Sequence, residues 1–196
     1  MNKLIPILVF LLLPNLCFAV GETFDGTKIR QLAFTENKGQ VTDQYHHTRH
    51  DIDFKIDAGN GLSIFIGGGA IHYQFYQADK TLSQPDDTAS ITYNMYRMDV
   101  QLIGANPDAN IITEQKNPYY ETYYTTGTSK DGAGVYSYNK ITYKDIYPFI
   151  DWVLYTKDGK LKHEFIVHPG GNVTSIQLRY NGQKQIKILE DGSLLA

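Results

Sequence analysis

The chain has 196 residues and a formal charge of −3, and its 18 basic residues form no basic run. A mildly acidic chain of this kind is a poor candidate for binding nucleic acid or anionic membranes. Its single cysteine excludes an internal disulfide, so a buried core must stabilise the fold.

Residues 1–19 have the pattern of a secretory signal peptide. A lysine precedes an apolar run at 4–13, and small residues end the segment, which predicts cleavage after Ala19. Because an apolar run of about ten residues is shorter than the roughly 20 that span a bilayer, we expect no retained membrane helix. Cys17 raises lipidation as an alternative, but Leu16 is bulky where a lipid-attachment site needs a small residue. The pattern predicts a secreted or cell-surface protein.

The mature part, residues 20–196, is predicted to form a single β domain that is ordered over 24–196. Apolar and polar residues alternate with a period of two along most of it, and no helical periodicity exceeds two turns. Short strands separated by turns, without cysteine after cleavage, predict an all-β fold. The two candidate architectures are an antiparallel β-sandwich and an open barrel.

The first predicted strands are well marked. Residues 51–57 place Ile, Phe and Ile on one face and charged side chains on the other, which predicts one solvent-exposed face. Residues 62–66 and 70–76 are the next strands, and glycines 67–69 reverse the chain between them. Residues 78–90 lack apolar periodicity and are expected to form an exposed loop.

The strand pattern resumes at Ile91 with a change of phase. The predicted inward set is Ile91, Tyr93, Met95, Tyr96, Met98, Val100 and Leu102. This slip predicts a β-bulge near Met95. Further strands are expected at 111–115, 135–143, 175–180 and 185–189.

The clearest local signal is a hairpin around Asp158-Gly159. This two-residue loop favours positive φ at both positions, so Lys157 is expected to face Lys160. The pairs that follow outward are Thr156–Leu161, Tyr155–Lys162, Leu154–His163, Val153–Glu164, Trp152–Phe165 and Asp151–Ile166. The Trp152 face is mainly apolar and aromatic, which predicts a sheet with one side in a core.

Five sequence blocks, in their order and spacing, carry a resemblance to a known family. They are FTENKGQ (34–40), VQLIGANP (100–107), YYETYYTTG (119–127), ITYKDIYPFIDWVLY (141–155) and LKHEFIVHPGGNVTSIQLRYNG with the later EDGSL (161–182 and 190–194). Together they resemble the uncharacterised N-terminal domain of large secreted proteins of gliding bacteria. Many of those proteins carry SBBP-type propeller repeats or immunoglobulin-like modules and a type IX sorting signal.

The resemblance implies an extracellular β domain and supplies no catalytic residues, since that family has no established activity. Relatives usually continue after EDGSL through another strand pair and then into repeats. We therefore expect that the domain is truncated at its C-terminal end. Downstream domains of the same polypeptide are then expected partners.

Tyrosines are the main candidate binding residues, and the chain has 15 of them. Tyr119, Tyr120, Tyr123 and Tyr124 are grouped closely enough to form a platform. Tyrosine offers rigid contact area with a polar tip and suits cell-surface proteins or glycans as partners. Core and cross-strand packing is the alternative, because alternation turns half of such residues inward.

Asp151 and Glu164 are the candidate acid pair. They share one face of the predicted hairpin diagonally, about 7 Å apart, and glycosidases use two carboxyl groups about 5 to 9 Å apart. Diagonal acids are common on sheets, however, and Lys160 and Lys162 are near enough to neutralise them. Surface salt bridging is therefore the favoured interpretation.

A possible metal-binding set precedes the first long strand and contains His46, His47, His50, Asp51 and Asp53. Imidazole and carboxylate ligands suit zinc. The spacing argues against a site. His46 and His50 would share a face on a helix, but the next segment alternates as a strand, where Asp51 and Asp53 share a face with Lys55. A solvated edge is expected, with no metal and no cofactor.

No serine or cysteine nucleophile lies in a recognisable elbow, and no phosphate-binding loop follows a strand. We therefore expect a non-enzymatic extracellular β domain with a structural, assembly or adhesion role. The alternative is a carbohydrate-binding or glycan-processing module that uses exposed tyrosines.

Overall fold

The computed structural model describes residues 32–78 and 93–195. The signal peptide, residues 24–31, nearly all of the 78–90 loop and Ile91 lie outside the described residues. The strands are β1 (Phe34–Glu36), β2 (Phe54–Gly59), β3 (Leu62–Gly67), β4 (Ala70–Ala78), β5 (Tyr93–Leu102), β6 (Asn110–Tyr123), β7 (Ala133–Tyr147), β8 (Ile150–Lys157), β9 (Lys160–Val167), β10 (Leu178–Asn181), β11 (Lys187–Ile188) and β12 (Leu194–Leu195). A 3₁₀ turn at Val173–Ser175 is the one helical element among these residues, so the all-β prediction is confirmed.

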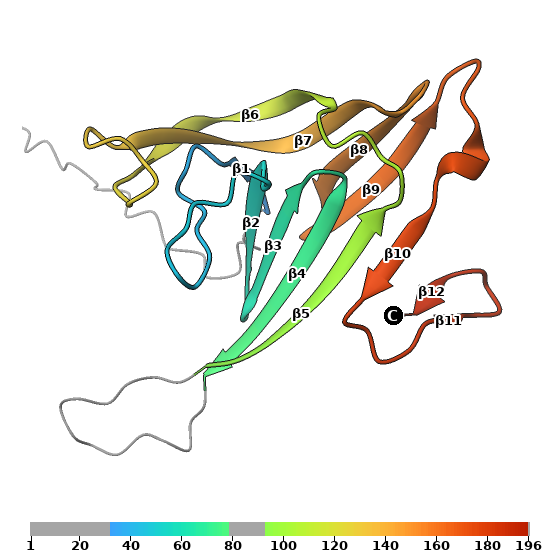
Figure 1. Cartoon of the computed structure of the whole chain (residues 1–196), viewed down its shortest axis with the longest axis horizontal. Coiled ribbons are helices and arrows are strands. Elements are labelled where there is room, and N and C mark those ends of the chain that lie inside the picture. Colours follow the sequence, from blue (N-terminus) through green and yellow to red (C-terminus); the bar gives the residue numbers. More distant parts are fainter. Residues whose placement is uncertain (1–31, 79–92, 196) are drawn as a thin grey trace, which may run out of the picture.

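All strands from β1 to β10 belong to one antiparallel sheet, which branches at β7 (Figure 1). One edge of β7 pairs with β6. The other edge pairs first with β1 and then with β8. The long wing therefore runs β1-β2-β3-β4-β5-β10, and the short wing runs β8-β9.

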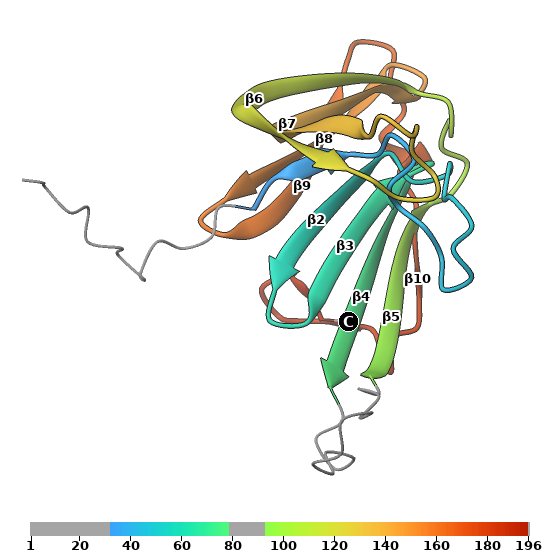
Figure 2. The same ribbon diagram turned by 90° about the vertical axis from the view of Figure 1, so that its left-hand side faces the viewer.

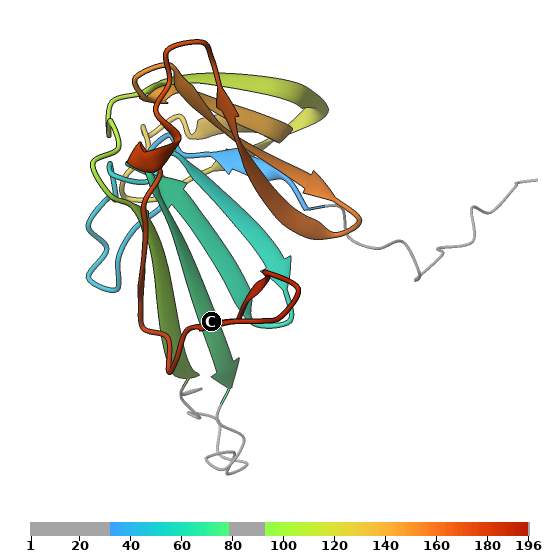
Figure 3. The same ribbon diagram turned by 90° about the vertical axis from the view of Figure 1, so that its right-hand side faces the viewer.

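The sheet curls into a half-barrel, which corresponds to the open-barrel form of the prediction. Figure 2 shows the long wing descending from the crossing pair β6–β7, and Figure 3 shows β9 and β10 as the two ends of the curled sheet. A separate small hairpin, β11–β12, follows β10.

The core lies between the inner faces of the two wings. Side chains at most 4% exposed include Phe34, Phe54, Ile56, Ile64, Ile66 and Ile71 from the long wing and Ile150, Trp152 and Leu154 from the short wing. Full burial of such a side chain contributes roughly 1.5–3 kcal/mol. Rings at the centre make specific contacts, with centroids 5.3 Å apart for Tyr143 and Trp152 and 6.4 Å for Phe34 and Phe54. The predicted inward position is confirmed for Phe54 and Ile56, whereas Ile52 is buried outside the core cluster.

The predicted hairpin register is also confirmed, for all seven pairs from Lys157–Lys160 to Asp151–Ile166. Its loop residues Asp158 and Gly159 have φ values of 52° and 68°. A two-residue turn of this kind matches the twist of the flanking strands and so fixes the pairing.

The predicted β-bulge near Met95 is wrong. Pairing of β4 with β5 is continuous from Ala70–Gln101 to Ala78–Tyr93. Met95 and Tyr96 are 62% and 46% exposed, because this end of the strand pair extends beyond the core. Met95 and Tyr96 therefore alternate between the two faces of the sheet, and no bulge is needed to turn both of them inward.

Two smaller expectations also change. Asp53, expected on a solvent-exposed face, is partly buried and accepts a hydrogen bond of 2.9 Å from the Tyr143 hydroxyl. Burial raises the pKa of Asp53. The strand expected over 175–180 begins only at Leu178, because the Asn172 side chain caps the preceding 3₁₀ turn.

Within the connection from β1 to β2, residues 37–51 form a loop that folds over the outer face of the long wing. Asn37 organises it by donating to the carbonyls of Arg49 and Ile52, both at 2.8 Å, and by accepting from the backbone N–H groups of Gly39 and Val41. Gly39 also lies against Gly127 of the β6–β7 connection. This contact ties two loops that are far apart in the sequence.

Gly127→Ala is expected to lower the free energy of unfolding by about 1–3 kcal/mol, the usual effect of overpacking. An added Cβ would lie 2.0 Å from the Gly39 carbonyl oxygen and 2.4 Å from Thr48 Oγ1. The matched control is Gly134→Ala, where the nearest atom is 3.4 Å away on the Tyr120 ring. Urea denaturation of both variants checks this, and equal stability would contradict it.

Candidate functional site: a groove across the long wing

Strand pairing aligns outward-facing side chains in two rows across the long wing. Each residue pairs with the next in the first row, which holds Thr35, Lys55, Phe65, His72 and Asp99. The second row holds Asp57, Ser63, Gln74 and Arg97. Because neighbours along a strand face opposite sides and the intervening residues fill the core, both rows lie on the outer face.

Three hollows follow these rows and are named here the first, second and third hollow, with volumes of about 340, 280 and 270 Å³. The first and second share Val41, Thr42 and Phe65 as lining residues. The second and third share Thr35, Asp57 and Glu121. Since neighbouring hollows share walls, they form one row across the strands, which we call the groove.

Two segments wall the groove. Gln40, Val41 and Thr42 of the 37–51 loop line the second hollow on one side, and Glu121 and Tyr123 of β6 line it as well. The Gly39–Gly127 contact joins the loop to the connection that follows β6. The two walls are therefore linked at the backbone.

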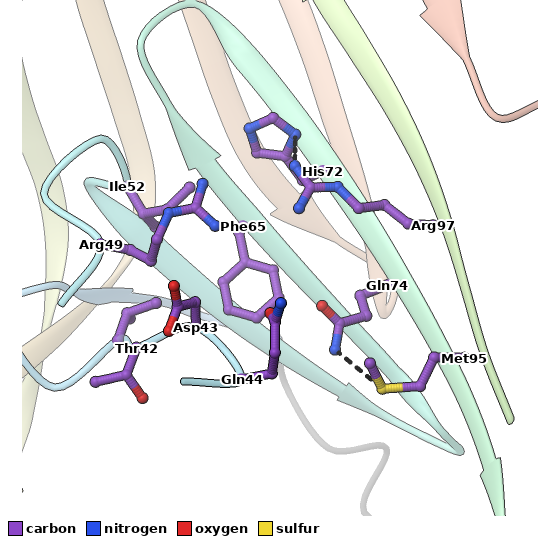
Figure 4. A pocket seen from close by; sticks show the side chains of 11 residues that line it. Thr42, Asp43, Gln44, Arg49, Ile52, Phe65, His72, Gln74, Met95 and Arg97 are labelled. Carbon is purple, nitrogen blue, oxygen red and sulfur yellow. Dashed lines mark hydrogen bonds between the residues drawn. The ribbon is translucent and has the colours of Figure 1, made fainter. Parts of the chain in front are cut away.

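Figure 4 shows the first hollow, with the Phe65 ring between the loop and the β4–β5 side chains. Thr42, Asp43, Gln44 and Arg49 come from the loop, while His72, Gln74, Met95 and Arg97 come from the strands. An aromatic ring is thus surrounded by amide, hydroxyl and charged groups. Such a mixture of an apolar surface and a few polar groups is typical of ligand sites.

Both arginines of the first hollow are held by carboxylates. Arg49 donates from Nε and Nη2 to the two oxygens of Asp51, at 2.7 and 2.5 Å. Arg97 Nε donates to Asp99 Oδ1 at 2.7 Å. The Nδ1 atom of His72, which is 9% exposed, lies 2.8 Å from that oxygen and 2.9 Å from Arg97 Nη2.

The pKa values of these two carboxyls follow from their partners. For Asp99, burial acts to raise the pKa, but Arg97 and His72 outweigh it and the pKa is lowered. The hydrogen bonds from Arg49 likewise lower the pKa of Asp51, against the effect of burial. Both groups are carboxylates at neutral pH, so the guanidinium orientations are fixed.

The structure separates the four predicted binding tyrosines into two sets. Tyr119 lines the third hollow and Tyr123 the second. Tyr120 instead packs against Tyr136 with ring centroids 5.6 Å apart and ring planes tilted by 55°, and Tyr124 is 74% exposed without lining any of the three hollows. The groove therefore uses two of the four.

Tyr123 is oriented by Glu121. Its hydroxyl donates to Glu121 Oε2 at 2.6 Å. Burial, reinforced by Glu121, raises the pKa of Tyr123 to about 12. The hydroxyl therefore remains a donor at neutral pH and holds this carboxylate in place.

The third hollow contains an unpaired acceptor. Within the described part of the chain, the buried Oδ1 atom of Asn139 has no hydrogen-bond partner. Buried polar atoms are nearly always paired in native proteins. A ligand hydroxyl or water that donates to Asn139 would complete this hollow.

The candidate acid pair does not form a site. Asp151 is 2% exposed and is bound by Lys144, by the backbone N–H of Asp145 at 2.9 Å and by His168 Nε2 at 2.8 Å. Its cation is therefore Lys144 of β7, whereas Lys160 and Lys162 were expected to neutralise it. Glu164 is exposed, and neither carboxyl lines the three hollows.

The candidate metal ligands are dispersed. Asp51 binds Arg49, Asp53 binds Tyr143, and His47 Nδ1 lies 3.3 Å from Asp43. His46 and His50 are exposed. Over residues 32–78 and 93–195, no three acidic, histidine or cysteine side chains gather as a metal site would require.

The fold and groove define an all-β half-barrel domain with an elongated surface site. The chain belongs to the family described as Domain of unknown function (DUF7948), whose model matches residues 34–196. No curated protein and no solved structure matches the chain. In the described residues, no helix has the length and apolar character needed to cross a membrane.

The ion pair at Asp151 predicts a pH dependence of stability. Although burial opposes it, Lys144, Asp145 and His168 lower the pKa of Asp151 from 3.8 to about 2. Because the pKa of Asp151 is lower in the folded state than in the unfolded state, its ionised carboxylate stabilises the fold at pH values above the unfolded-state pKa. This stabilisation is lost as the pH falls toward 2. The contribution is about 2 kcal/mol.

Urea unfolding at pH 5, 4, 3 and 2 measures this contribution as the difference between the wild-type protein and Asp151→Asn. The variant is expected to be less stable at pH 5, with the difference shrinking toward pH 2. A difference that stays constant over this range would show that the carboxylate is not held as described.

Proposed function

We propose that this domain is a non-enzymatic module of a secreted cell-surface protein, and that it serves adhesion by binding a glycan chain in the groove. The row of three adjoining hollows carries the proposal. The signal-peptide pattern supports export. The resemblance to N-terminal domains of gliding-motility-associated, type IX-secreted proteins with SBBP repeats supports a place at the cell surface.

The construction of the groove favours a glycan over an extended peptide. Most of its floor consists of side chains on β1 to β4, which are paired on both edges, and β5 also pairs with β10 from Asp99 to Leu102. A peptide that binds by strand addition needs a free strand edge for main-chain hydrogen bonds. A glycan needs only aromatic surfaces and polar side chains, and the groove offers Phe65, Tyr119 and Tyr123 together with amides.

The carboxylates favour binding without catalysis. Asp151 is committed to its ion pair, and Glu164 lies outside the three hollows. Within the groove, Glu121 accepts the Tyr123 hydroxyl. Glycosidases need one carboxylic acid that stays protonated near neutral pH. The pKa of Asp43 in the first hollow is instead lowered, because its carboxylate accepts a hydrogen bond from the backbone N–H of His47.

A glycan array probed with the purified protein tests the proposal. Binding is expected, and the double variant Tyr119→Ala/Tyr123→Ala should weaken it about tenfold or more because aromatic contact area is lost. The matched control, Tyr120→Ala/Tyr124→Ala, removes the same atoms outside the hollows. It should change binding by less than about twofold.

Equal losses in both double variants would contradict a role for the groove. Incubation of the bound glycan with the protein should release no new reducing ends. Release that is abolished by Glu121→Gln would overturn the non-enzymatic part of the proposal.

Assembly is a second candidate function, favoured by an apolar surface near the end of the chain. Its exposed side chains are Ile186, Ile188, Leu189, Leu194 and Leu195. In the described residues, β9 and β10 each pair on one edge only. Exposed apolar side chains beside open strand edges are typical of surfaces that pair with further β structure.

A further inference from the structure

We infer that the first hollow binds one neutral pyranose ring of the glycan, stacked on Phe65 and held through a pair of vicinal hydroxyls by Arg49 and Arg97. The inference deepens the proposed function and rests on it. It assigns the ligand class and the residues that select it.

Phe65 is the surface on which the sugar stacks. It is partly buried in β3 and lines both the first and the second hollow. Lys55 Nζ lies 5.8 Å from the ring centroid, and Lys55 lines the second hollow. An aromatic face carries negative potential and attracts the C–H groups of a pyranose. The shared position of Phe65 lets the glycan continue into the second hollow.

The two guanidinium groups supply oriented donors. A guanidinium has five N–H bonds in a rigid plane. Arg49 directs one bond each from Nε and Nη2 to Asp51. Arg97 directs Nε to Asp99, and its Nη2 lies 2.9 Å from His72 Nδ1. The Nη1 group of each arginine remains for a ligand. The parallel N–H bonds of this planar fork suit two neighbouring oxygen atoms, as in a vicinal diol.

The amide groups complete the polar surroundings. Gln44 from the loop and Gln74 from β4 both line the first hollow. Each amide can donate and accept, which matches a hydroxyl that also does both. In Figure 4 these amides lie on the same side of Phe65 as Met95, and His72 and Arg97 lie together at the other end.

The charge balance selects a neutral sugar. Each arginine is already paired with a carboxylate, and Asp43 adds a further negative charge to the lining. The lining therefore has no uncompensated positive charge for a uronic acid. An acidic sugar would place its carboxylate beside like charges, which is unfavourable.

Calorimetry with defined tetrasaccharides tests this assignment. The neutral probes are cellotetraose, maltotetraose and mannotetraose, and the acidic counterpart is tetragalacturonate. At least one neutral probe is expected to bind more tightly than tetragalacturonate. Phe65→Leu and Arg97→Lys should each weaken that binding about tenfold, since they remove the stacking ring and the fork but keep size or charge.

Arg179→Lys is the matched control, because Arg179 of β10 lies outside the three hollows. It should leave affinity unchanged. Dispersion of the amide NMR spectrum establishes that each variant is folded, and amide shifts on binding should centre on β3, β4 and the 37–51 loop.

The outcomes distinguish a failure of the pyranose subsite from a failure of glycan binding by the groove as a whole. Tighter binding of tetragalacturonate would overturn the neutral assignment. Binding that is lost in Tyr119→Ala/Tyr123→Ala but is insensitive to Phe65→Leu and Arg97→Lys would overturn the subsite and leave the groove in place. Absence of binding by all four probes would overturn both.

Discussion

The architecture depends on one edge of β7 serving two strands in succession. A strand edge accepts one hydrogen-bonded partner at each position, so β1 pairs at Ser137–Tyr138 and β8 begins to pair at Lys140. Two strands cannot continue side by side from the same edge, and the sheet must therefore divide into wings. The space between the wings is filled by Phe34, Trp152 and their neighbours, which form the core.

The groove is a consequence of the same division. The long wing turns its apolar face toward the short wing, so in the part of the chain that the structure describes no second sheet covers the outward rows of β1 to β5. Because β6 continues past the branch point on the far edge of β7, its tyrosine-bearing end reaches the side of these rows, opposite the 37–51 loop. The site is thus made by strands that already stabilise the core.

Local signals accounted for the parts of the fold that were predicted correctly. The Asp158-Gly159 turn fixes the register of β8 and β9, because two residues determine where every later pair falls. The error at Met95 arose because periodicity cannot indicate where the core ends along a strand pair. Alternation separates Tyr119 and Tyr123 from Tyr120, but it cannot say which set meets a groove. That depends on pairs such as Thr35 and Glu121, which are distant in sequence.

Asp151 also shows that local sequence signals predict strand pairing but not contacts that depend on the tertiary structure. Its hairpin position was predicted, but its partner Lys144 was not, because their approach requires the register shift of β7 between Tyr143 and Tyr147.

The likeness of the sequence blocks to a known kind of domain agrees with the family match over 34–196 at the level of a domain of unknown function.

The contact between Gly39 and Gly127 fixes the distance between the two walls of the groove. It joins the two walls through the backbone atoms of two glycines, which have no side chains that substitution elsewhere in the lining could lengthen or shorten. Replacing residues such as Gln40, Thr42 or Glu121 changes the chemistry of the lining but not the spacing of the walls. In the proposed glycan site, substitutions of the lining would therefore change which polymer is recognised, while the width of polymer admitted would stay the same.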